Sequence, residues 1–210
     1  MELVKPKVEL INAPDYYALI NTIELAGRTC YKSENRITHG SAEKFVKGII
    51  QRGHEAVLEH SSITVKFTCD RGVSHEIVRH RLAAYCQEST RYCNYRLKDG
   101  NGANIFVVEP STVCKGTEAY SAWFCACLAA ERAYFEMLNW GCTPQEARSV
   151  LPNSLKTELV MTANVREWRH FLKQRCDVAA HPDIRVLARM LLKVFQEKYP
   201  VLFEDIRYDD

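Results

Sequence analysis

The feature that most constrains this chain is the short segment 79–92, which reads RHRLAAYCQESTRY. Its basic and hydroxyl side chains are those of Arg79, His80, Arg81, Ser89, Thr90 and Arg91. Arginine stays charged at any working pH and presents a rigid fork of donors that suits phosphate oxygens and ring carbonyls. Neighbouring hydroxyl and backbone donors are of the kind that hold a phosphate. The segment therefore predicts a site for an anionic ligand.

The simplest alternative is that these arginines form a solvated helix face with surface ion pairs. Apolar residues, however, stand on both sides of the charges, in Ile77-Val78 and in residues 82–84. We therefore expect Arg79 and Arg81 to lie in a stretch that packs. A buried arginine needs an anionic or acceptor-rich partner, and a bound ligand is one way to supply it.

Composition narrows the class of protein. Hydrophobic residues make up 47% of the chain and charged residues 26%, which is typical of a folded globular protein. We expect one domain, residues 1–210. The net charge of +2 disfavours a non-specific nucleic-acid binder. The sequence has no apolar run long enough to cross a membrane, so we expect no membrane span. The first residues have no signal-peptide pattern. The nine cysteines contain no CxxC pair, so reduced thiols in the cytoplasm fit better than a disulfide framework.

The hydrophobic pattern predicts a mixed α+β fold. Alternating residues predict strands at 8–13, 62–69, 104–108 and 155–161. Helical spacing and cap residues predict helices at 15–28, 41–52 with Ser41 as N-cap, 73–82, 117–139, 143–151, 164–175 and 182–199. Helices and strands do not alternate strictly, and no Gly-rich nucleotide-binding motif occurs, so a doubly wound sheet is disfavoured. We expect Cys125 and Cys127, in the longest helix, to be small core residues.

The arginine-rich segment resembles the signature RHRxxSxxxxSxR of the flavin-dependent thymidylate synthases. The residues RHRLAAYCQESTR match it at every fixed position except the first serine, where Ala84 stands and one hydroxyl is lost. Three further segments resemble the family in the same order, namely 53–67, 147–152 and 164–175. The resemblance implies a single α+β domain with a central, mostly antiparallel sheet flanked by helices. It also implies a homotetramer with active sites at the subunit interfaces.

The resemblance implies that the chain binds FAD. The implied cofactor-binding residues are His54, Ala56, Arg79, His80, Arg81, Gln87, Asn164, Val165, Arg166 and His170. Positive charge close to a flavin ring stabilises its reduced, anionic form, which gives a physical reason for the basic cluster. No metal is expected.

The implied reaction is the reductive methylation of dUMP to dTMP. The carbon donor would be 5,10-methylenetetrahydrofolate and the reductant NADPH, and no protein cysteine would act as nucleophile. The implied substrate-binding residues are Glu76, Ile77, Val78, Arg79, Gln87, Glu88, Ser89, Thr90, Arg91, Arg148 and Arg175. Arg175 is the expected catalytic residue, because a guanidinium beside the uracil stabilises charge that spreads into the ring.

Three other functions are open on the residues alone. His54, Glu55, Glu59 and His60 suggest a metal hydrolase, although their spacing fits neither HExxH nor HxxEH. Cys86 lies within the arginine-rich segment, where nearby positive charge could activate a thiol nucleophile. The run RYCNYR interleaves arginine with tyrosine as in an RNA-binding module, which the balanced overall charge disfavours.

Overall fold

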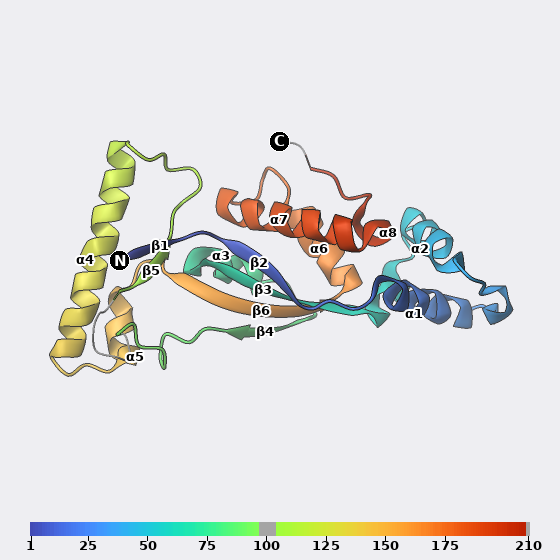
Figure 1. The fold of residues 1–210 in the computed structure, drawn as a ribbon, viewed down its shortest axis with the longest axis horizontal. Helices are drawn as coiled ribbons and strands as arrows, with labels where there is room; N and C mark the ends of the chain where they lie inside the picture. Colours follow the sequence, from blue (N-terminus) through green and yellow to red (C-terminus); the bar gives the residue numbers. More distant parts are fainter. Residues whose placement is uncertain (97–103, 209–210) are drawn as a thin grey trace. The chain divides into compact units, whose positions relative to one another are not determined.

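A computed structural model of the chain describes residues 1–96 and 104–208 (Figure 1). The fold is α+β, as predicted, with an antiparallel sheet flanked by helices. The four strands of this sheet lie in the order β2-β3-β6-β4. Their bounds are Lys7–Asn12 for β2, Ser62–Asp70 for β3, Lys156–Asn164 for β6 and Ala83–Gln87 for β4. A second, parallel pair joins β1 (Glu2–Val4) to β5 (Phe106–Val108), with Leu3 opposite Val107.

The chain divides into two compact units. Unit 1 comprises residues 1–7, 67–79 and 86–159, and unit 2 comprises residues 8–66, 80–85 and 160–210.

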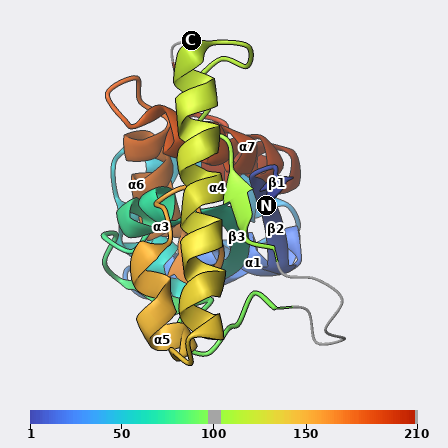
Figure 2. The same cartoon turned by 90° about the vertical axis from the view of Figure 1, so that its left-hand side faces the viewer.

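Unit 1 is built around the long helix α4 (Glu118–Asn139), which Figure 2 shows along its whole length. Thr117 caps this helix by accepting a hydrogen bond from the amide of Tyr120 at 3.2 Å. Next come α5 (Pro144–Ala147) and the 3-10 turn η3 (Arg148–Val150), which pack against α4. The predicted capping box of Thr143 and Glu146 is confirmed at the start of α5. The core of this unit consists of Tyr95, Ile105, Val107, Cys127, Tyr134, Ala147 and Leu155.

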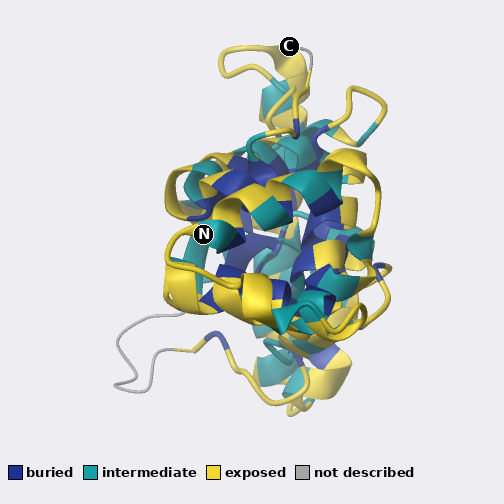
Figure 3. Cartoon of the chain, turned by 90° about the vertical axis from the view of Figure 1, so that its right-hand side faces the viewer, coloured by how far each residue is buried: buried dark blue, intermediate teal, exposed yellow. Residues whose placement is uncertain are grey.

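Unit 2 holds most of the remaining helices. These are α1 (Tyr16–Thr29), η1 (Glu34–Arg36), α2 (Ser41–Gln51), η2 (Glu55–His60), α6 (Val165–Arg175), α7 (Pro182–Lys198) and α8 (Pro200–Phe203). The packed side predicted for α6 is confirmed, because Trp168, Phe171 and Leu172 are fully buried. The indole of Trp168 donates to the carbonyl of Ile63 at 3.0 Å, which ties α6 to β3. Figure 3 colours the buried positions dark blue.

Strand patterns read from the sequence are confirmed where side chains alternate. Ile63, Val65 and Phe67 of β3 are fully buried, as are Leu159 and Met161 of β6. The fold thus follows the period of two that a half-buried strand requires.

The segment after β3 differs from the prediction. Its helix, α3, runs only from Arg71 to Ile77, so the helix expected to reach residue 82 is wrong over its last turn. Leu82 has a φ of +65°, which no helical residue adopts. The residues that follow form strand β4, which the sequence pattern did not indicate.

Two smaller expectations also need correction. Gly40, with a φ of +78°, is the N-cap of α2, and Ser41 is already helical. The Ser41 hydroxyl contacts the carboxylate of Glu24 instead of capping the helix. Of the two cysteines expected in the core, Cys127 is buried but Cys125 is exposed, since residues two apart point to different helix faces.

Two further expectations concern the cysteines and membrane-spanning helices. All nine cysteines are free. Within the described ranges, no helix is both long and apolar enough to cross a bilayer.

Candidate active site

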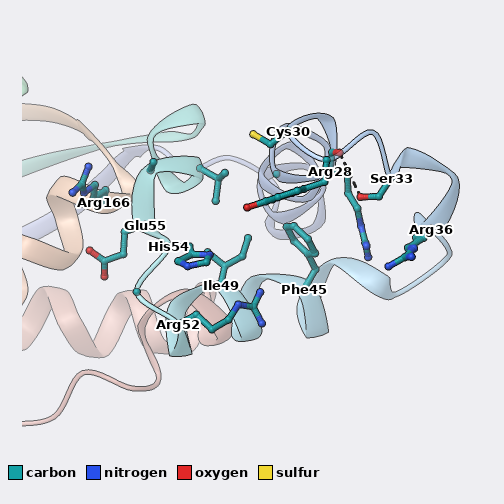
Figure 4. A pocket seen from close by; sticks show the side chains of 15 residues that line it. Arg28, Cys30, Ser33, Arg36, Phe45, Ile49, Arg52, His54, Glu55 and Arg166 are labelled. Carbon is teal, nitrogen blue, oxygen red and sulfur yellow. Dashed lines mark hydrogen bonds between the residues drawn. The ribbon is translucent and has the colours of Figure 1, made fainter.

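Unit 2 contains a hollow of about 780 Å³ between α1, α2 and η2, which we call the arginine pocket (Figure 4). A volume of this size is typical of small-molecule sites. The pocket is lined by Gly27, Arg28, Cys30, Tyr31, Ser33, Arg36, Phe45, Ile49, Arg52, Gly53, His54, Glu55, Ala56, Val57 and Arg166. Four of these residues are arginines, and the single acid is Glu55. The pocket therefore combines apolar walls with an excess of positive charge.

Arg28 is held in place at one end of the arginine pocket. Its Nε and Nη2 atoms donate to Oε1 of Glu24 at 3.1 and 2.9 Å. The other carboxylate oxygen of Glu24 accepts from the Ser41 hydroxyl at 2.7 Å. The guanidinium carbon of Arg28 also lies 4.6 Å from the centroid of the Phe45 ring, within the range of a cation–π contact. These contacts fix a positive charge beside an aromatic wall before any ligand binds.

Three of the predicted cofactor-binding residues lie together in this pocket. His54 precedes η2 at the point where the chain leaves α2, and Ala56 follows in η2 itself. Arg166 comes from the first turn of α6, and its Nη1 atom donates to Glu59 at 2.6 Å. Figure 4 shows His54 and Arg166 on the same side of the hollow. Sequence reasoning thus brought together residues that are more than a hundred positions apart.

The start of α6 holds two more predicted residues. Asn164 caps the helix, because its side-chain oxygen accepts from the amide of Glu167 at 2.9 Å. Val165 is fully buried, so only its main chain can reach a ligand. This helix start was predicted from the Asn164 and Glu167 spacing, which is confirmed.

A second group of side chains in unit 2, the histidine cluster, comprises His80, Glu167 and Arg175. The Nε atom of Arg175 donates to Nε2 of His80 at 2.9 Å. The other ring nitrogen, Nδ1, lies 3.4 Å from Oε1 of Glu167. Burial, with the charges of Arg175 and His170 adding to it, lowers the pKa of His80 to about 4. His80 is therefore a neutral imidazole at physiological pH.

His170 also lies beside His80, next to the histidine cluster. The rings of His170 and His80 meet edge to face, with 5.7 Å between their centroids. Burial raises the pKa of Glu167 above its usual value. Among the described residues, His80, Glu167 and His170 are the group close enough to share a metal ion, and the set from His54 to His60 does not form one. The residues from His54 to His60, which suggested a metal hydrolase in the sequence, therefore do not form a metal-binding group in the described part of the chain.

Unit 1 contains a smaller hollow of about 450 Å³, which we call the phosphate hollow. It is lined by Arg71, His75, Thr90, Gln145, Arg148, Ser149, Leu151, Pro152, Asn153 and Leu155. Arg148, which belongs to the predicted substrate set, donates from Nη1 to the hydroxyl of Thr90 at 3.2 Å. Thr90 is itself 7% exposed. This pair places a guanidinium and a hydroxyl side by side, a donor set suited to a phosphate.

The residues around the phosphate hollow are oriented by neighbours within unit 1. The amide nitrogen of Gln87 donates to the hydroxyls of Ser74 at 2.8 Å and Thr157 at 3.3 Å. Glu88 pairs with Lys156 at 3.1 Å. Ser89 accepts a hydrogen bond from the amide of Arg91 at 3.3 Å. These contacts hold the second half of the arginine-rich segment in a defined conformation.

The first half of that segment differs from expectation. Arg79 and Arg81 are exposed, so the prediction that both lie in a packed stretch is wrong for the single chain. His80 between them is buried. The short turn between α3 and β4 directs neighbouring side chains to opposite sides.

The other predicted substrate residues are spread over exposed and buried positions of unit 1. Ile77 is fully buried, Glu76 is half-buried and Val78 is 39% exposed. Arg91 is exposed, and its guanidinium carbon lies 5.2 Å from the centroid of the Tyr92 ring. Their role in binding dUMP stays a prediction.

Sequence reasoning missed several residues of both hollows. In the arginine pocket these are Arg28, Arg36 and Arg52, and in the phosphate hollow they are Arg71 and His75. A lone arginine near a helix end reads as an ordinary surface charge, so the sequence gives little to separate it from others. The spacing of Glu24 and Arg28 on one helix was the single available signal.

Comparisons with known proteins show which family the chain resembles. A family model described as "Thymidylate synthase complementing protein" (Thy1) matches residues 15–201. A protein of Geobacter sulfurreducens named flavin-dependent thymidylate synthase is 33% identical over 190 residues, which cover 87% of this chain and 80% of that protein. One of the same name from Pyrococcus furiosus is 34% identical and covers 86% and 71%. Another, from Mycobacteroides abscessus, is 33% identical and covers 97% and 91%.

A solved structure has the same fold. It is described as the UMP/dUMP methylase PolB from Streptomyces cacaoi bound with 5-Br dUMP, and it aligns with a TM-score of 0.79 at 24% identity. The alignment covers 97% of this chain and 96% of that one. Because the Thy1 model matches nearly the whole sequence, including every predicted site residue, this chain belongs to the thymidylate synthase complementing protein family.

Proposed function

We propose that this chain is a flavin-dependent thymidylate synthase, which converts dUMP to dTMP by reductive methylation. The carbon donor is 5,10-methylenetetrahydrofolate, FAD carries the hydride and NADPH is the reductant. The observation that carries the proposal is the match to the Thy1 family over residues 15–201, together with relatives of that activity at 33–34% identity. The geometry of the two hollows supports it.

The arginine pocket fits a flavin dinucleotide by the chemistry of its side chains. Such a ligand carries a doubly charged diphosphate and a flat aromatic ring, and the pocket offers arginines beside the apolar walls of Phe45, Ile49 and Val57. Its one acid, Glu55, lies 3.5 Å from Lys173 and 3.6 Å from Arg169, so its charge is compensated. We assign His54, Ala56, Arg166 and Arg28 to this ligand. The chemistry that bound FAD supplies is hydride transfer to the one-carbon unit.

The phosphate hollow fits the second ligand of the reaction, dUMP. Arg148 and Thr90 offer a guanidinium and a hydroxyl to the phosphate of dUMP, and Arg71 lines the same hollow. A fixed arginine can bind two phosphate oxygens at once, which orients the nucleotide as well as binding it. Ser89 and Arg91 stand on either side of Thr90 in the sequence and complete the donor set that we assign to the phosphate and ribose.

Arg175 is the residue that we assign to the uracil ring. Its Nε atom donates to Nε2 of His80, and this bond orients the guanidinium. A guanidinium facing N3 and a ring carbonyl stabilises negative charge that develops in the pyrimidine, so the C5 position becomes a better nucleophile. In this scheme the protein supplies electrostatic stabilisation and positioning, and it forms no covalent bond to the substrate.

We further propose that the enzyme is a cytoplasmic homotetramer whose active sites lie at subunit interfaces. Support comes from the arginine-rich segment, in which Arg79 and Arg81 are exposed next to Val78 and Leu82, at 39% and 78% exposure. Apolar side chains around exposed arginines are expected where another subunit and its ligands cover them. Free thiols throughout the chain support a reducing compartment.

The test is the substitution Arg175→Ala in protein purified with its flavin. We expect the visible flavin absorbance to persist, because Arg175 is outside the arginine pocket. Turnover, measured as tritium release from C5 of labelled dUMP, should fall about 100- to 1,000-fold, the usual cost of removing one preorganised donor.

The matched control is Gln174→Ala, an exposed neighbour on the same helix, which should change turnover less than twofold. Unchanged turnover in Arg175→Ala would remove this residue from its assigned role. Wild-type protein that purifies without flavin and releases no tritium would refute the function itself.

A further inference from the structure

His80 is fixed from several directions within unit 2. Its side chain is 2% exposed, and its ring packs edge to face against Phe171 with 4.8 Å between centroids. The hydroxyl of Tyr85 donates to its carbonyl oxygen at 2.5 Å. Each ring nitrogen faces an ionisable side chain, Arg175 on one side and Glu167 on the other. Because the ring has little room to move, a shift of Glu167 on one side should also move the ring relative to Arg175 on the other.

The hydrogen bond from Arg175 determines where His80 carries its proton. A guanidinium can only donate, so Nε2 of His80 must offer its lone pair. The ring is neutral at physiological pH, since burial lowers the pKa of His80 to about 4. A neutral imidazole with a free Nε2 bears its proton on Nδ1. Nδ1 lies 3.4 Å from Oε1 of Glu167, close enough for the charge of the carboxylate to favour a proton on that nitrogen.

Glu167 is placed for this contact by the helix itself. Its amide donates to Asn164 at the N-cap, which sets the first turn of α6, and Glu167 is 8% exposed. Its Oε1 atom is buried and has no hydrogen-bond partner in the described part of the chain. A buried, unsatisfied carboxylate oxygen costs free energy and is unusual unless it has a role.

A metal site explains this group less well. Ligand atoms of His80, Glu167 and His170 lie within 4.8 Å of one another, as a metal would require. The Nε2 lone pair, however, already accepts from a guanidinium that always carries a positive charge. A cation bound beside it would be repelled, so the cluster is better described as an Arg175–His80 hydrogen bond with a carboxylate close to the opposite ring nitrogen.

We propose that Glu167 is a positioning residue for Arg175, acting through His80. The carboxylate holds the imidazole in the tautomer whose Nε2 accepts from the Nε–H of Arg175. This bond fixes the plane of the guanidinium, and thereby the direction in which its terminal nitrogens point. The inference rests on the proposed function insofar as Arg175 contacts the uracil. Carboxylate–imidazole pairs set ligand orientation by the same means at metal and nucleophile sites.

The test combines Glu167→Gln with Arg175→Ala in a double-mutant cycle. In the wild-type background, Glu167→Gln should lower kcat about 100-fold, the effect of a small misplacement of a catalytic group, with little change in KM for dUMP. In the Arg175→Ala background the same substitution should lower kcat less than twofold, because nothing is left to position. An equal loss in both backgrounds would overturn the proposal.

A second measurement does not depend on catalysis. Nitrogen NMR of the wild-type protein with labelled histidine should show the His80 ring neutral and protonated on Nδ1 at neutral pH. A proton on Nε2 would contradict the proposal even if the enzyme is fully active. Conversely, the predicted tautomer in a protein that never methylates dUMP would refute the proposed function but would still support the proposed effect of Glu167 on His80. Glu197→Gln, an exposed acid on α7, is the matched control and should change neither measurement.

Discussion

Two buried carboxylates of unit 2 have opposite surroundings. Glu24 is 1% exposed and both its oxygens are occupied, one by Arg28 and the other by Ser41. Glu167 is 8% exposed, and its Oε1 faces a neutral imidazole without forming a hydrogen bond. A satisfied pair stabilises the fold, whereas an unsatisfied acid beside a histidine with a shifted pKa is typical of a functional site. Burial alone therefore does not reveal what a charged residue does.

Arg28 and Arg175, the arginines near these two acids, also differ in what holds them in place. Arg28 is held directly by a carboxylate, which offsets part of its charge where it lines the arginine pocket. Arg175 donates from Nε to a neutral imidazole, so this bond orients the guanidinium without placing a negative charge at Nε. An arginine that must stabilise charge in a reaction is better oriented by a neutral group than by an acid, because an acid would compensate that charge in advance.

The largest effect on stability is expected from Glu24→Gln. The substitution keeps the shape but removes the charge that compensates Arg28, whose side chain is 16% exposed. Breaking such a pair by removing one partner should lower the free energy of unfolding by about 3 kcal/mol. Urea unfolding at a fixed protein concentration, followed by tryptophan fluorescence, measures this.

Glu167→Gln is the comparison for that experiment. It should change the free energy of unfolding by less than about 1 kcal/mol, since no charged pair is broken. If Glu167→Gln destabilises the protein as much as Glu24→Gln, the distinction between a structural and a functional carboxylate is wrong. The exposed Glu197→Gln gives the baseline for removing one surface charge.

A smaller effect is expected in the pH dependence of stability. The pKa of His80 is lowered to about 4 in the folded protein, against a usual value near 6.5 in the unfolded chain. Between these values the unfolded chain binds more protons, so stability falls as the pH is lowered, by at most about 1.4 kcal/mol per pH unit. The groups that face His80 are Arg175, Glu167 and His170 on α6 and Tyr85 on β4.

The raised pKa of Glu167 acts in the opposite sense. Above its usual value the folded protein binds this proton more readily than the unfolded chain, which partly offsets the effect of His80. The comparison of wild type with His80→Gln across pH 4.5 to 7 isolates the histidine, since its substitution should flatten the slope. A parallel pair of curves would show that His80 titrates normally and that the histidine cluster is not closed to water.

Local signals were sufficient for much of the fold, and long-range contacts account for the rest. Asn164 and Thr143 could be recognised as caps because the groups that they bind lie three residues away. Strand β4 could not, because its extended conformation comes from pairing with a distant strand, as in the bond from the amide of Glu88 to the carbonyl of Glu158 at 2.9 Å. Propensity is a weak guide when tertiary pairing decides.

The candidate site shows the same division. Resemblance to a family named His80 and Arg175 separately, but their contact spans 95 positions and no periodicity reports it. The exposure of Arg79 and Arg81 beside a buried His80 depends on a turn at Leu82, whose positive φ is unusual for a leucine. His80, which the family resemblance assigns to the cofactor, is thus buried and contacts Arg175 of the same chain.

The smallest effect is expected from Cys86→Ser. If the histidine cluster activates the pyrimidine by electrostatics, then no thiol needs to attack it, and turnover should stay within twofold of wild type. Cys86 is exposed on β4, and Cys176, which follows Arg175, is buried with its pKa raised to about 11 by that burial, so it is a poor nucleophile. Tritium release from labelled dUMP measures the result, with Cys125→Ser as an exposed control in unit 1. Near-total loss in Cys86→Ser alone would mean that the chemistry resides in a thiol, and that the neutral histidine and its unsatisfied glutamate only support the fold.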